Sequence, residues 1–341
     1  MRSFISQLEN GEDLSSIQVG EAVSGLLSEN VDSDSKALFL RALRAKGETA
    51  QEIADFVTAL LSHAVDPGIE PQKLAGPMID VCGTGGDRLD LFNVSTTSMF
   101  VLAAGGAVVV KHGNRGISSK CGGADVLEAL GVRIDHAAAD MKHCVETVGL
   151  GFMFAPHHHP AFKAIAPVRK MLAAQGVTTI FNLLGPLLNP ARPAYQLVGV
   201  FDRAMLAKYA AVLRLLGRKR AWALNSQGAD EIMPFESTDV VETVAGVEER
   251  EFLIHPWHLG VQPCAVEELR GGDCETNAKI LTGILDGAIR GGKRDIVLLN
   301  AAAGFVVTGL AHDLHAGMAL ANEQLDSGRA LGKLRVLQKF N

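Results

Sequence analysis

Hydrophobic residues follow a helical period in the first part of the chain. Apolar positions recur at helical spacing over residues 38–43 and again over residues 53–61. Thr49 lies before the second segment and Glu52 follows three residues later, which is the pattern of a capping box at a helix start. We therefore predict a small helical domain over residues 1–72.

From residue 78 onward, short apolar runs alternate with longer helical segments. The predicted strands are residues 78–82, 107–110, 196–200, 221–224 and 296–298. The predicted helices are residues 94–104, 124–130, 137–148, 203–216 and 275–288. This alternation favours an α/β domain with helices around a largely parallel sheet. Residues 238–252 show a charged, valine-rich alternation typical of antiparallel strands, so we predict a mixed, mainly parallel central sheet within residues 73–341.

The composition limits the classes of protein to which the chain can belong. Its 341 residues are 48% hydrophobic and 21% charged, as in globular proteins, and the formal net charge of −6 gives no electrostatic footprint for nucleic acid. Residues 99–110 form the longest nearly uncharged apolar run, shorter than the roughly 20 residues that span a bilayer. Acidic residues occupy the place of a signal peptide's apolar core. We expect a cytoplasmic protein that binds neither nucleic acid nor a membrane.

The cysteine pattern predicts free thiols. Five cysteines make an odd number, and none forms a C-x-x-C pair. Cys121 lies beside Lys120 and before a predicted helix, and such surroundings lower the pKa of a thiol. A role as a small residue that fills loop space is nevertheless favoured for Cys121.

Two glycine- and hydroxyl-rich loops follow the first two predicted strands. The first reads GTGGD over residues 83–87 and leads to NVST at residues 93–96; the second reads KHGNR over residues 111–115 and leads to SSK at residues 118–120. Glycine lets backbone N–H groups approach an anion, and helix N-termini favour negative charge. We therefore predict a polyphosphate site where both loops meet at one edge of the sheet. Asp87 suits a sugar hydroxyl or a metal better than a phosphate oxygen.

Two common phosphate-binding motifs do not fit the sequence. The dinucleotide fingerprint G-x-G-x-x-G requires glycine at position 88, which is Arg88. The nucleotide-binding loop G-x-x-x-x-G-K-[ST] does not occur in the sequence. The polyphosphate is therefore expected to bind in another type of loop.

With these loops the sequence resembles the anthranilate phosphoribosyltransferases of tryptophan biosynthesis. Further matches are APVR at residues 166–169, FNLLGP at 181–186 followed by NP at 189–190, DE at 230–231 and RDIVLLN at 294–300. The resemblance covers nearly the whole chain. It implies transfer of the phosphoribosyl group of phosphoribosyl pyrophosphate (PRPP) to the amino group of anthranilate, which gives phosphoribosylanthranilate and pyrophosphate. It also implies that helices within residues 162–184 pack against the N-terminal domain, and that the second substrate binds between the domains.

The resemblance assigns PRPP to the two loops and magnesium to three side chains. The implied PRPP-binding residues are Gly83, Gly86, Asp87, Asn93, Val94, Ser95, Thr96, Lys111, His112, Gly113, Asn114, Arg115, Gly116, Ile117, Ser118, Ser119 and Gly123. The implied metal ligands are Ser95, Asp230 and Glu231, with about two Mg²⁺ ions when PRPP is bound. Because charge accumulates on the departing pyrophosphate, anion stabilisation and placement of the nucleophile are the main requirements. No residue is assigned as a general acid or base.

The implied anthranilate contacts lie in both halves of the chain. They are Gly83, Asn114, Pro156, His159 and Arg169. The planar guanidinium of Arg169 matches a carboxylate in a bidentate way. His159 ends a run of three adjacent histidines, which point in different directions and so do not favour a zinc site. His159 is instead expected to line the acceptor channel with Phe162 and His112.

Several positions depart from the family pattern. Leu91 stands where a threonine is usual, Arg88 where a glycine is common, and Cys121 and Gly123 replace serines. The stretch after Arg169 is about two residues longer than usual at residues 173–175, beside the acceptor site, and Thr178 falls where an arginine is frequent. Three alternatives therefore stay open: a transferase with another aromatic acceptor, a nucleoside phosphorylase, and a non-catalytic paralogue that binds nucleic acid. The retained acceptor and metal residues disfavour the second, and the net charge of −6 disfavours the third.

The resemblance also implies a homodimer formed through the helical domain. Phe4, Ile5 and Leu8 are expected to be exposed there, which would suit such an interface.

Overall fold

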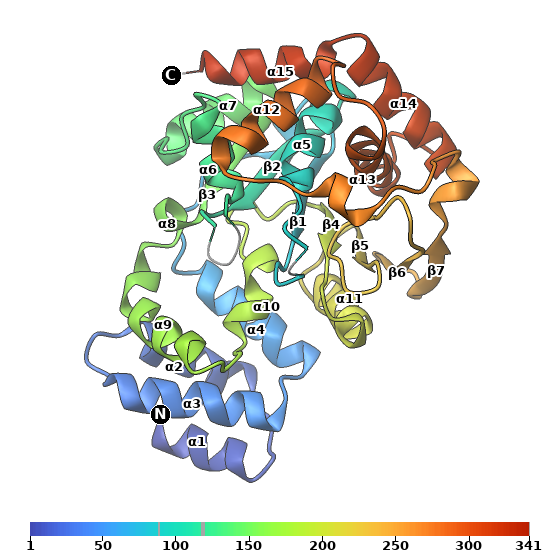
Figure 1. Ribbon diagram of the computed structural model, residues 1–341. Helices are drawn as coiled ribbons and strands as arrows, with labels where there is room; N and C mark the ends of the chain where they lie inside the picture. Colours follow the sequence, from blue (N-terminus) through green and yellow to red (C-terminus); the bar gives the residue numbers. More distant parts are fainter. Residues whose placement is uncertain (88, 117–119, 341) are drawn as a thin grey trace.

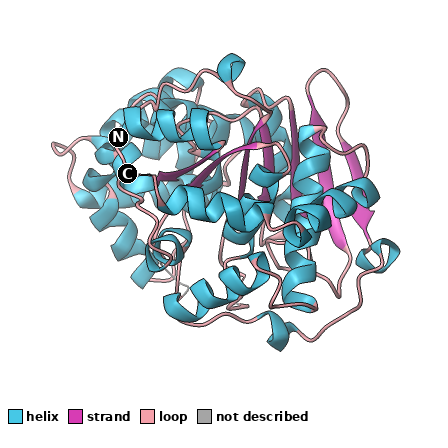
Figure 2. Cartoon of the chain, turned by 90° about the horizontal axis from the view of Figure 1, so that it is seen from above, coloured by secondary structure: helices cyan, strands magenta, loops and turns pink. Residues whose placement is uncertain are grey.

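The computed structural model describes residues 1–87, 89–116 and 120–340. Its N-terminal part is helical, and the rest is built on a sheet with helices on both faces (Figures 1 and 2). The N-terminal helices are α1 (Arg2–Glu9), α2 (Ser16–Leu27), α3 (Ser33–Lys46) and α4 (Ala50–Leu61). The capping box predicted at the start of α4 is confirmed. The Thr49 N–H donates to Glu52 Oε2 at 2.9 Å, and the Glu52 N–H donates to Thr49 Oγ1 at 3.1 Å.

The sheet is mixed and mainly parallel, as predicted. Its seven strands are β1 (Met78–Gly83), β2 (Val108–Gly113), β3 (Leu150–Phe154), β4 (Tyr195–Gly199), β5 (Arg220–Asn225), β6 (Thr238–Val244) and β7 (Arg250–Ile254), in the spatial order β3-β2-β1-β4-β5-β6-β7. Strands β1 to β5 are parallel. Strands β6 and β7 are antiparallel, which confirms the prediction for residues 238–252.

The order of the strands places a topological switch point between β1 and β4. From β1 the chain proceeds to β2 and β3 on one side, and it then returns to β4 on the other side of β1. The helical connections of these two halves diverge here, and ligands of open α/β sheets bind at such points, outside the carboxyl ends of the strands. Gly83 and Gly199, the last residues of β1 and β4, lie opposite each other in register.

The remaining helices cover both faces of the sheet (Figure 2). They are α5 (Val94–Ala104), α6 (Gly123–Ala129), α7 (Ala138–Val148), α8 (Ala155–His158), α9 (Ala166–Ala174), α10 (Phe181–Leu184), α11 (Leu206–Leu215), α12 (Cys274–Leu285), α13 (Gly292–Thr308), α14 (Leu314–Asp326) and α15 (Arg329–Gln338). Short 3₁₀ helices are η1 (Pro71–Lys73), η2 (Pro160–Ala164), η3 (Gly185–Leu187), η4 (Arg203–Met205), η5 (Pro256–Leu259) and η6 (Val266–Leu269). Of the helices in the described residues, none combines the length and apolar character needed to span a bilayer.

Three local predictions differ from the structure. Residues 296–298 are not a strand, because they lie inside the 17-residue helix α13. That helix is buried on almost all sides, so its apolar run lacks the one-sided pattern of a surface helix. Strand β3 is apolar and was not predicted from the sequence. Leu8 is not exposed, because its side chain faces the core of the N-terminal helices.

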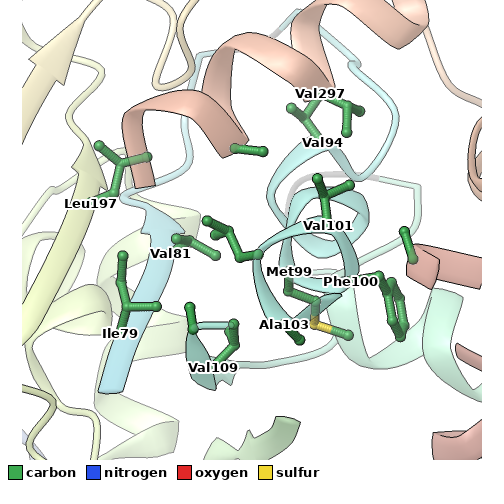
Figure 3. Close-up of a cluster of buried hydrophobic side chains, with 14 of the residues drawn as sticks. Ile79, Val81, Val94, Met99, Phe100, Val101, Ala103, Val109, Leu197 and Val297 are labelled. Atoms are coloured by element: carbon green, nitrogen blue, oxygen red, sulfur yellow. The ribbon is translucent and has the colours of Figure 1, made fainter. Parts of the chain in front are cut away.

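Two hydrophobic cores lie on opposite faces of the sheet. Side chains alternate along a strand, so Trp222 and Leu224 of β5 belong to one core, whereas Ala221 and Ala223 belong to the other. Figure 3 shows the first core between β1 and α5, where Val81, Val101 and Val109 gather. The second core contains side chains of α11 and also those of α1 to α4, so the N-terminal helices share it with this face of the sheet.

Residues 155–188 connect the two parts of the molecule. Helix α9 packs against α3, and η2 packs against α2 (Figure 1). Lys36 of α3 donates to the carbonyl of Ala164 at 3.1 Å. His158 and Val65 form two hydrogen bonds, one from the Val65 N–H to the His158 carbonyl at 2.8 Å and one between His158 Nδ1 and the Val65 carbonyl at 3.1 Å.

Candidate active site

The loop after β1 crosses the carboxyl end of the sheet at the switch point. Gly85 and Gly86 have φ values of 69° and 95°, which side-chain-bearing residues rarely adopt. The Thr84 N–H donates to the Gly199 carbonyl at 2.9 Å, and the Gly85 N–H donates to Asp230 Oδ2 at 2.7 Å. The loop therefore joins the ends of β1 and β4 to the acidic loop that follows β5.

Gly83 and Gly199 leave the space that Asp230 occupies. A Cβ atom on Gly83 would lie 2.2 Å from Asp230 Oδ2, and one on Gly199 would lie 1.6 Å from the Asp230 carbonyl oxygen. Both distances are far below van der Waals contact. Glycine at these two positions is thus required for the carboxylate of Asp230 to lie over the switch point.

The acidic loop is held by hydrogen bonds to its backbone. Ser226 Oγ donates to the Glu231 carbonyl at 2.7 Å. The side-chain amide of Asn300, on α13, hydrogen-bonds both the N–H and the carbonyl of Ile232, each at 3.1 Å. The backbone on the C-terminal side of Glu231 is therefore anchored to buried groups.

Both carboxylates of this loop have raised pKa values. Burial, followed by the nearby charge of Asp87, raises the pKa of Asp230 to about 7. Burial and the charge of Asp230 raise the pKa of Glu231 well above its usual range, while Lys111 acts in the opposite direction. Two neighbouring buried acids whose ionised forms are disfavoured in this way favour binding of a cation.

Lys111 and Ser95 form the floor of the site beneath these acids. The side chain of Lys111 is buried, and its Nζ donates to the Val81 carbonyl at 2.6 Å and to Ser95 Oγ at 3.1 Å. Ser95 lies in the first turn of α5, where the side chain of Asn93 does not cap the helix. Asn93 instead donates to the Cys121 carbonyl at 3.0 Å and accepts from Asn277 at 2.9 Å. Without that side-chain cap, the first turn of α5 presents backbone N–H groups to an anion.

The donor set at this point fits Mg²⁺. A cavity of about 10 Å³, room for roughly one water molecule, is lined by Ser95, Asp230, Glu231 and Asn300 among others. Within the described ranges, no three His, Cys, Asp or Glu side chains form a ready-made cation cluster. Two carboxylates and a hydroxyl therefore leave coordination positions for water and substrate phosphates, which is how Mg²⁺ is usually held.

Asp125 organises the loop after β2. Its Oδ2 accepts from the N–H groups of Gly116 and Gly122 at 2.8 and 2.9 Å. Arg115 donates to Asp125 Oδ1 at 3.0 Å and also pairs with Glu128, so its guanidinium is neutralised within the loop. Ile117, Ser118 and Ser119, predicted to bind PRPP, lie outside the described residues, as does Arg88.

The other residues predicted to bind PRPP differ in how accessible their side chains are. The side chains of Val94 and Thr96 are buried. A Cβ atom on Gly123 would lie 3.1 Å from Thr96 Oγ1, which shows that the first turns of α5 and α6 pack closely. The expectation of a low thiol pKa at Cys121 is wrong, because burial and the neighbouring Cys274 raise it.

Arg169 is partly buried and has an aromatic neighbour. Its guanidinium lies over the ring of Phe181, 4.9 Å from the centroid, and burial lowers its pKa. In the part of the chain that the structure describes, no carboxylate lies within ion-pair distance of it. A partly desolvated guanidinium in this situation is suited to binding an external carboxylate.

A continuous series of ring contacts connects Arg169 with strand β2. Phe181 contacts Phe162 at a centroid distance of 5.9 Å, Phe162 contacts His159 at 5.0 Å, and His159 contacts His112 at 5.4 Å. His112 follows Lys111, whose Nζ reaches Ser95. The predicted acceptor and metal residues are thus joined through packed side chains.

Both histidines of this series are neutral. Burial lowers the pKa of His112 to about 3 and that of His159 to about 4. His112 Nδ1 lies 3.0 Å from the Gly185 carbonyl and His159 Nε2 lies 2.8 Å from the Leu188 carbonyl, which fixes these nitrogens as donors. Their other ring nitrogens are buried and find no partner among the described residues. Of the other predicted acceptor contacts, Asn114 and Pro156 are exposed, and Gly83 is half-buried below Asp230.

Several residues that shape the site were not predicted from the sequence. Gly199, Ser226 and Asn300 all contact the acidic loop. Asp80 is fully buried, with Oδ1 accepting from the His112 N–H at 3.2 Å and Oδ2 accepting from Asn189 Nδ2 at 2.8 Å. Asp80 could have been identified from the sequence, because it is a charged residue within an otherwise apolar strand.

The chain matches two family models. Residues 75–331 match the α/β domain of the glycosyl transferase family, and residues 2–64 match its helical bundle domain.

Three relatives share nearly the whole chain. An anthranilate phosphoribosyltransferase of Roseiflexus castenholzii is 43% identical over 99% of this chain and 97% of its own length. The crystal structure of the Thermus thermophilus enzyme has 38% identity and a TM-score of 0.91, covering 99% of this chain and 98% of that one. The Saccharomyces cerevisiae enzyme in complex with PRPP and Mg has 26% identity and a TM-score of 0.87, covering 99% and 97%. The yeast enzyme is also known in complex with 4-fluoroanthranilate, in a structure with 25% identity and a TM-score of 0.86 that covers 99% of this chain and 96% of that one.

Proposed function

The chain belongs to the anthranilate phosphoribosyltransferases of the glycosyl transferase family, and we propose that its loops after β1, β2 and β5 hold PRPP and Mg²⁺ while Arg169 holds the acceptor. The enzyme transfers the phosphoribosyl group of PRPP to the amino group of anthranilate, which is the second step of tryptophan biosynthesis. The bond from ribose C1 to pyrophosphate breaks, a bond from C1 to the amino nitrogen forms, and that nitrogen releases one proton.

The meeting of the loops after β1 and β5 with the first turn of α5 at the β1/β4 switch point is the observation that supports this assignment. Glycine N–H groups of the first loop, the first turn of α5 and the carboxylates after β5 all meet around Ser95 and Asp230. PRPP is highly anionic, so helix N–H groups and the Lys111 ammonium would stabilise both its bound form and the charge that develops on pyrophosphate.

Magnesium use is a property of this family, as the yeast complex with PRPP and Mg illustrates. Ser95, Asp230 and Glu231 would hold the ion here, and we infer about two ions per active site when PRPP is present. When bound, Mg²⁺ neutralises the phosphate oxygens and the pyrophosphate that leaves. The carboxylates themselves orient the ion, and Gly83 and Gly199 give Asp230 the space to do so.

Arg169 would orient the acceptor through its carboxylate. The guanidinium has no acidic partner among residues of the described ranges, and Phe181 below it restricts its orientation. An aromatic amine is weakly basic and is unprotonated near neutral pH, so correct placement replaces a strong general base. His159 and His112 would border the acceptor as neutral rings, consistent with their low pKa values.

The direct test follows anthranilate fluorescence with PRPP and Mg²⁺, in the unmodified enzyme and in an Arg169→Ala variant. We expect a rapid, Mg²⁺-dependent loss of fluorescence that nearly disappears in the variant. If the unmodified enzyme binds PRPP by calorimetry without consuming anthranilate, another aromatic acceptor is the substrate. If the variant retains full activity, Arg169 is not the carboxylate partner.

The organisation of the chain beyond the active site is also part of this proposal. We infer a helical domain over residues 1–72, joined in space by helices from about 162–184, and a PRPP-binding domain over residues 73–341. We infer a homodimer that forms through the helical domain, in the cytoplasm and without nucleic acid, and the net charge of −6 supports the last point. Sedimentation of the purified enzyme would test the dimer, because a monomer at micromolar concentration contradicts it.

A further inference from the structure

We propose that Asn300 is a positioning residue that sets the direction of the metal-binding carboxylates by holding the backbone of Ile232. This inference rests on the proposed metal site at Ser95, Asp230 and Glu231, and it adds a residue whose side-chain hydrogen bonds go to backbone groups.

The side-chain amide of Asn300 is fully engaged with backbone groups. Its Oδ1 accepts from the Ile232 N–H at 3.1 Å, and its Nδ2 donates to the Ile232 carbonyl at 3.1 Å and to the Ile296 carbonyl at 2.8 Å. Asn300 is 3% exposed and Ile232 is fully buried, so water does not compete for these bonds. Asn300 therefore binds the backbone of the acidic loop, much as a neighbouring strand would. These bonds do not involve the side chain at position 232.

The position of Ile232 makes this attachment relevant to the metal. Ile232 directly follows Glu231, whose own carbonyl accepts from Ser226 Oγ at 2.7 Å. These fixed backbone groups set the position and direction from which the Glu231 side chain starts. Asn300 also lines the same small cavity as Ser95, Asp230 and Glu231.

Helix α13 contacts both parts of the metal site, which are the start of α5 and the acidic loop. It packs along α5, whose first turn carries Ser95, and Val297 of α13 belongs to the same core as Val94 of α5 (Figure 3). One turn further along α13, Asn300 holds the acidic loop. The hydroxyl and the carboxylates, which are far apart in sequence, are therefore set by one rigid element.

Side-chain packing of α13 alone would not require this amide. Burying an amide has a desolvation cost, and a leucine of similar size would pack well in a helix that is apolar on all sides. The bonds of Asn300 to the acidic loop offset that cost, because a leucine at this position would leave the Ile232 N–H and carbonyl unsatisfied. The arrangement resembles the outer hydrogen bonds that orient metal ligands in other proteins.

The test measures Mn²⁺, a paramagnetic substitute for Mg²⁺, by electron paramagnetic resonance in the presence of PRPP. We expect Asn300→Leu to weaken Mn²⁺ binding about 10-fold or more, the usual effect of removing a partner that orients a metal ligand. The Mg²⁺ concentration for half-maximal rate should rise in parallel, while the KM for anthranilate stays within about twofold, because Arg169 is untouched.

Thr308→Val is the matched control. Thr308 lies on the same helix, is also buried, and donates only to carbonyls of α13 at 2.8 and 3.1 Å. This variant should lose thermal stability with unchanged Mn²⁺ affinity. Should Asn300→Leu fail to fold, Asn300→Ser removes the same contacts with a smaller side chain and is judged by the same affinity.

The possible outcomes distinguish the role of Asn300 from the metal site on which that role depends. Weaker Mn²⁺ binding in an Asn300 variant, but not in Thr308→Val, supports the positioning role. Unchanged Mn²⁺ affinity in a folded Asn300 variant overturns it. Absence of PRPP-dependent Mn²⁺ binding in the unmodified enzyme overturns the metal site itself, and with it the role of Asn300.

Discussion

The two ends of the active site are built in different ways. At the metal end, Asp230, Ser95 and Lys111 are hydrogen-bonded to the loops and strands around them. At the acceptor end, the Arg169 guanidinium has a ring beneath it. Among the residues that the structure describes, it has no ion-pair partner, and His112 and His159 each keep one buried nitrogen without a hydrogen bond.

This difference matches the two substrates. The metal end is built from consecutive strands of one sheet, so its geometry exists before PRPP arrives. The acceptor end is built from α9, α10 and η2, which lie between the sheet and the N-terminal helices. Recognition of anthranilate therefore depends on how these two parts are held together, whereas recognition of PRPP depends mainly on the sheet.

The substitution Glu231→Gln should have the largest effect, and it tests the metal end. The substitution keeps the size of the side chain but removes a charge that the metal requires, so kcat/KM should fall on the order of 100-fold or more. The KM for anthranilate should change little, and steady-state fluorescence assays at varied Mg²⁺ measure both. Glu248→Gln, in the exposed β6–β7 connection, is the control. A loss of activity that appears only in the anthranilate KM would contradict the assignment of Glu231 to the metal end.

Arg169→Lys tests the opposite end. Lysine keeps the charge but cannot make the bidentate contact, so the KM for anthranilate should rise about 10-fold or more, in line with a charge-assisted hydrogen bond. The KM for PRPP should stay within about twofold. Lys170→Ala, an exposed neighbour on α9, should have no effect on either constant. Equal increases in both constants would show that the two ends are not independent.

The pH dependence should also differ between the ends. With a pKa of about 7, Asp230 must lose a proton before it binds Mg²⁺, so apparent Mg²⁺ affinity should fall below pH 7 by up to about tenfold per pH unit. The two histidines of the acceptor end do not titrate in this range, since the pKa values of His112 and His159 are about 3 and 4. Metal titrations followed by calorimetry with PRPP from about pH 6 to 8 would check this. A flat profile would mean that Asp230 is ionised throughout.

Asp230→Asn should give the smallest effect, on stability. The raised pKa means that the folded state binds a proton more tightly than the unfolded state, so stability from this group is greatest below pH 4 and is lost as pH rises through 7. Removing the charge should therefore stabilise the metal-free protein at pH 8 by at least about 1 kcal/mol more than it does at pH 5. Urea unfolding at both values measures this. Destabilisation at pH 8 would show that the ionised carboxylate is well solvated or paired.

The residues of the metal end were also easier to predict from the sequence than those of the acceptor end. Glycine loops after apolar strands, followed by Asn93 and Ser95 at a helix start, indicate an anion site by local chemistry alone. The arrival of Asp230 at the same point follows from the parallel order of β1, β4 and β5. Arg169, by contrast, was identified by family resemblance, because nothing in an isolated helix shows which domain it faces.

The erroneous strand at residues 296–298 has a physical explanation. A short run of isoleucine, valine and leucine fits a buried strand and a buried helix equally well. Its continuation through Asn300 to Val307 is too long for a typical strand and was the available evidence for a helix. The bonds of Asn300 to Ile232 span 68 residues of sequence, and local pattern does not encode such a pairing.

The core shared by the N-terminal helices and the sheet has a consequence for synthesis on the ribosome. Helices α1 to α4 are translated first, but part of their apolar surface packs with Val198, Val212 and Leu213, which are translated much later. We therefore expect the nascent N-terminal segment to remain loosely packed, and open to chaperones, until α11 has emerged from the exit tunnel.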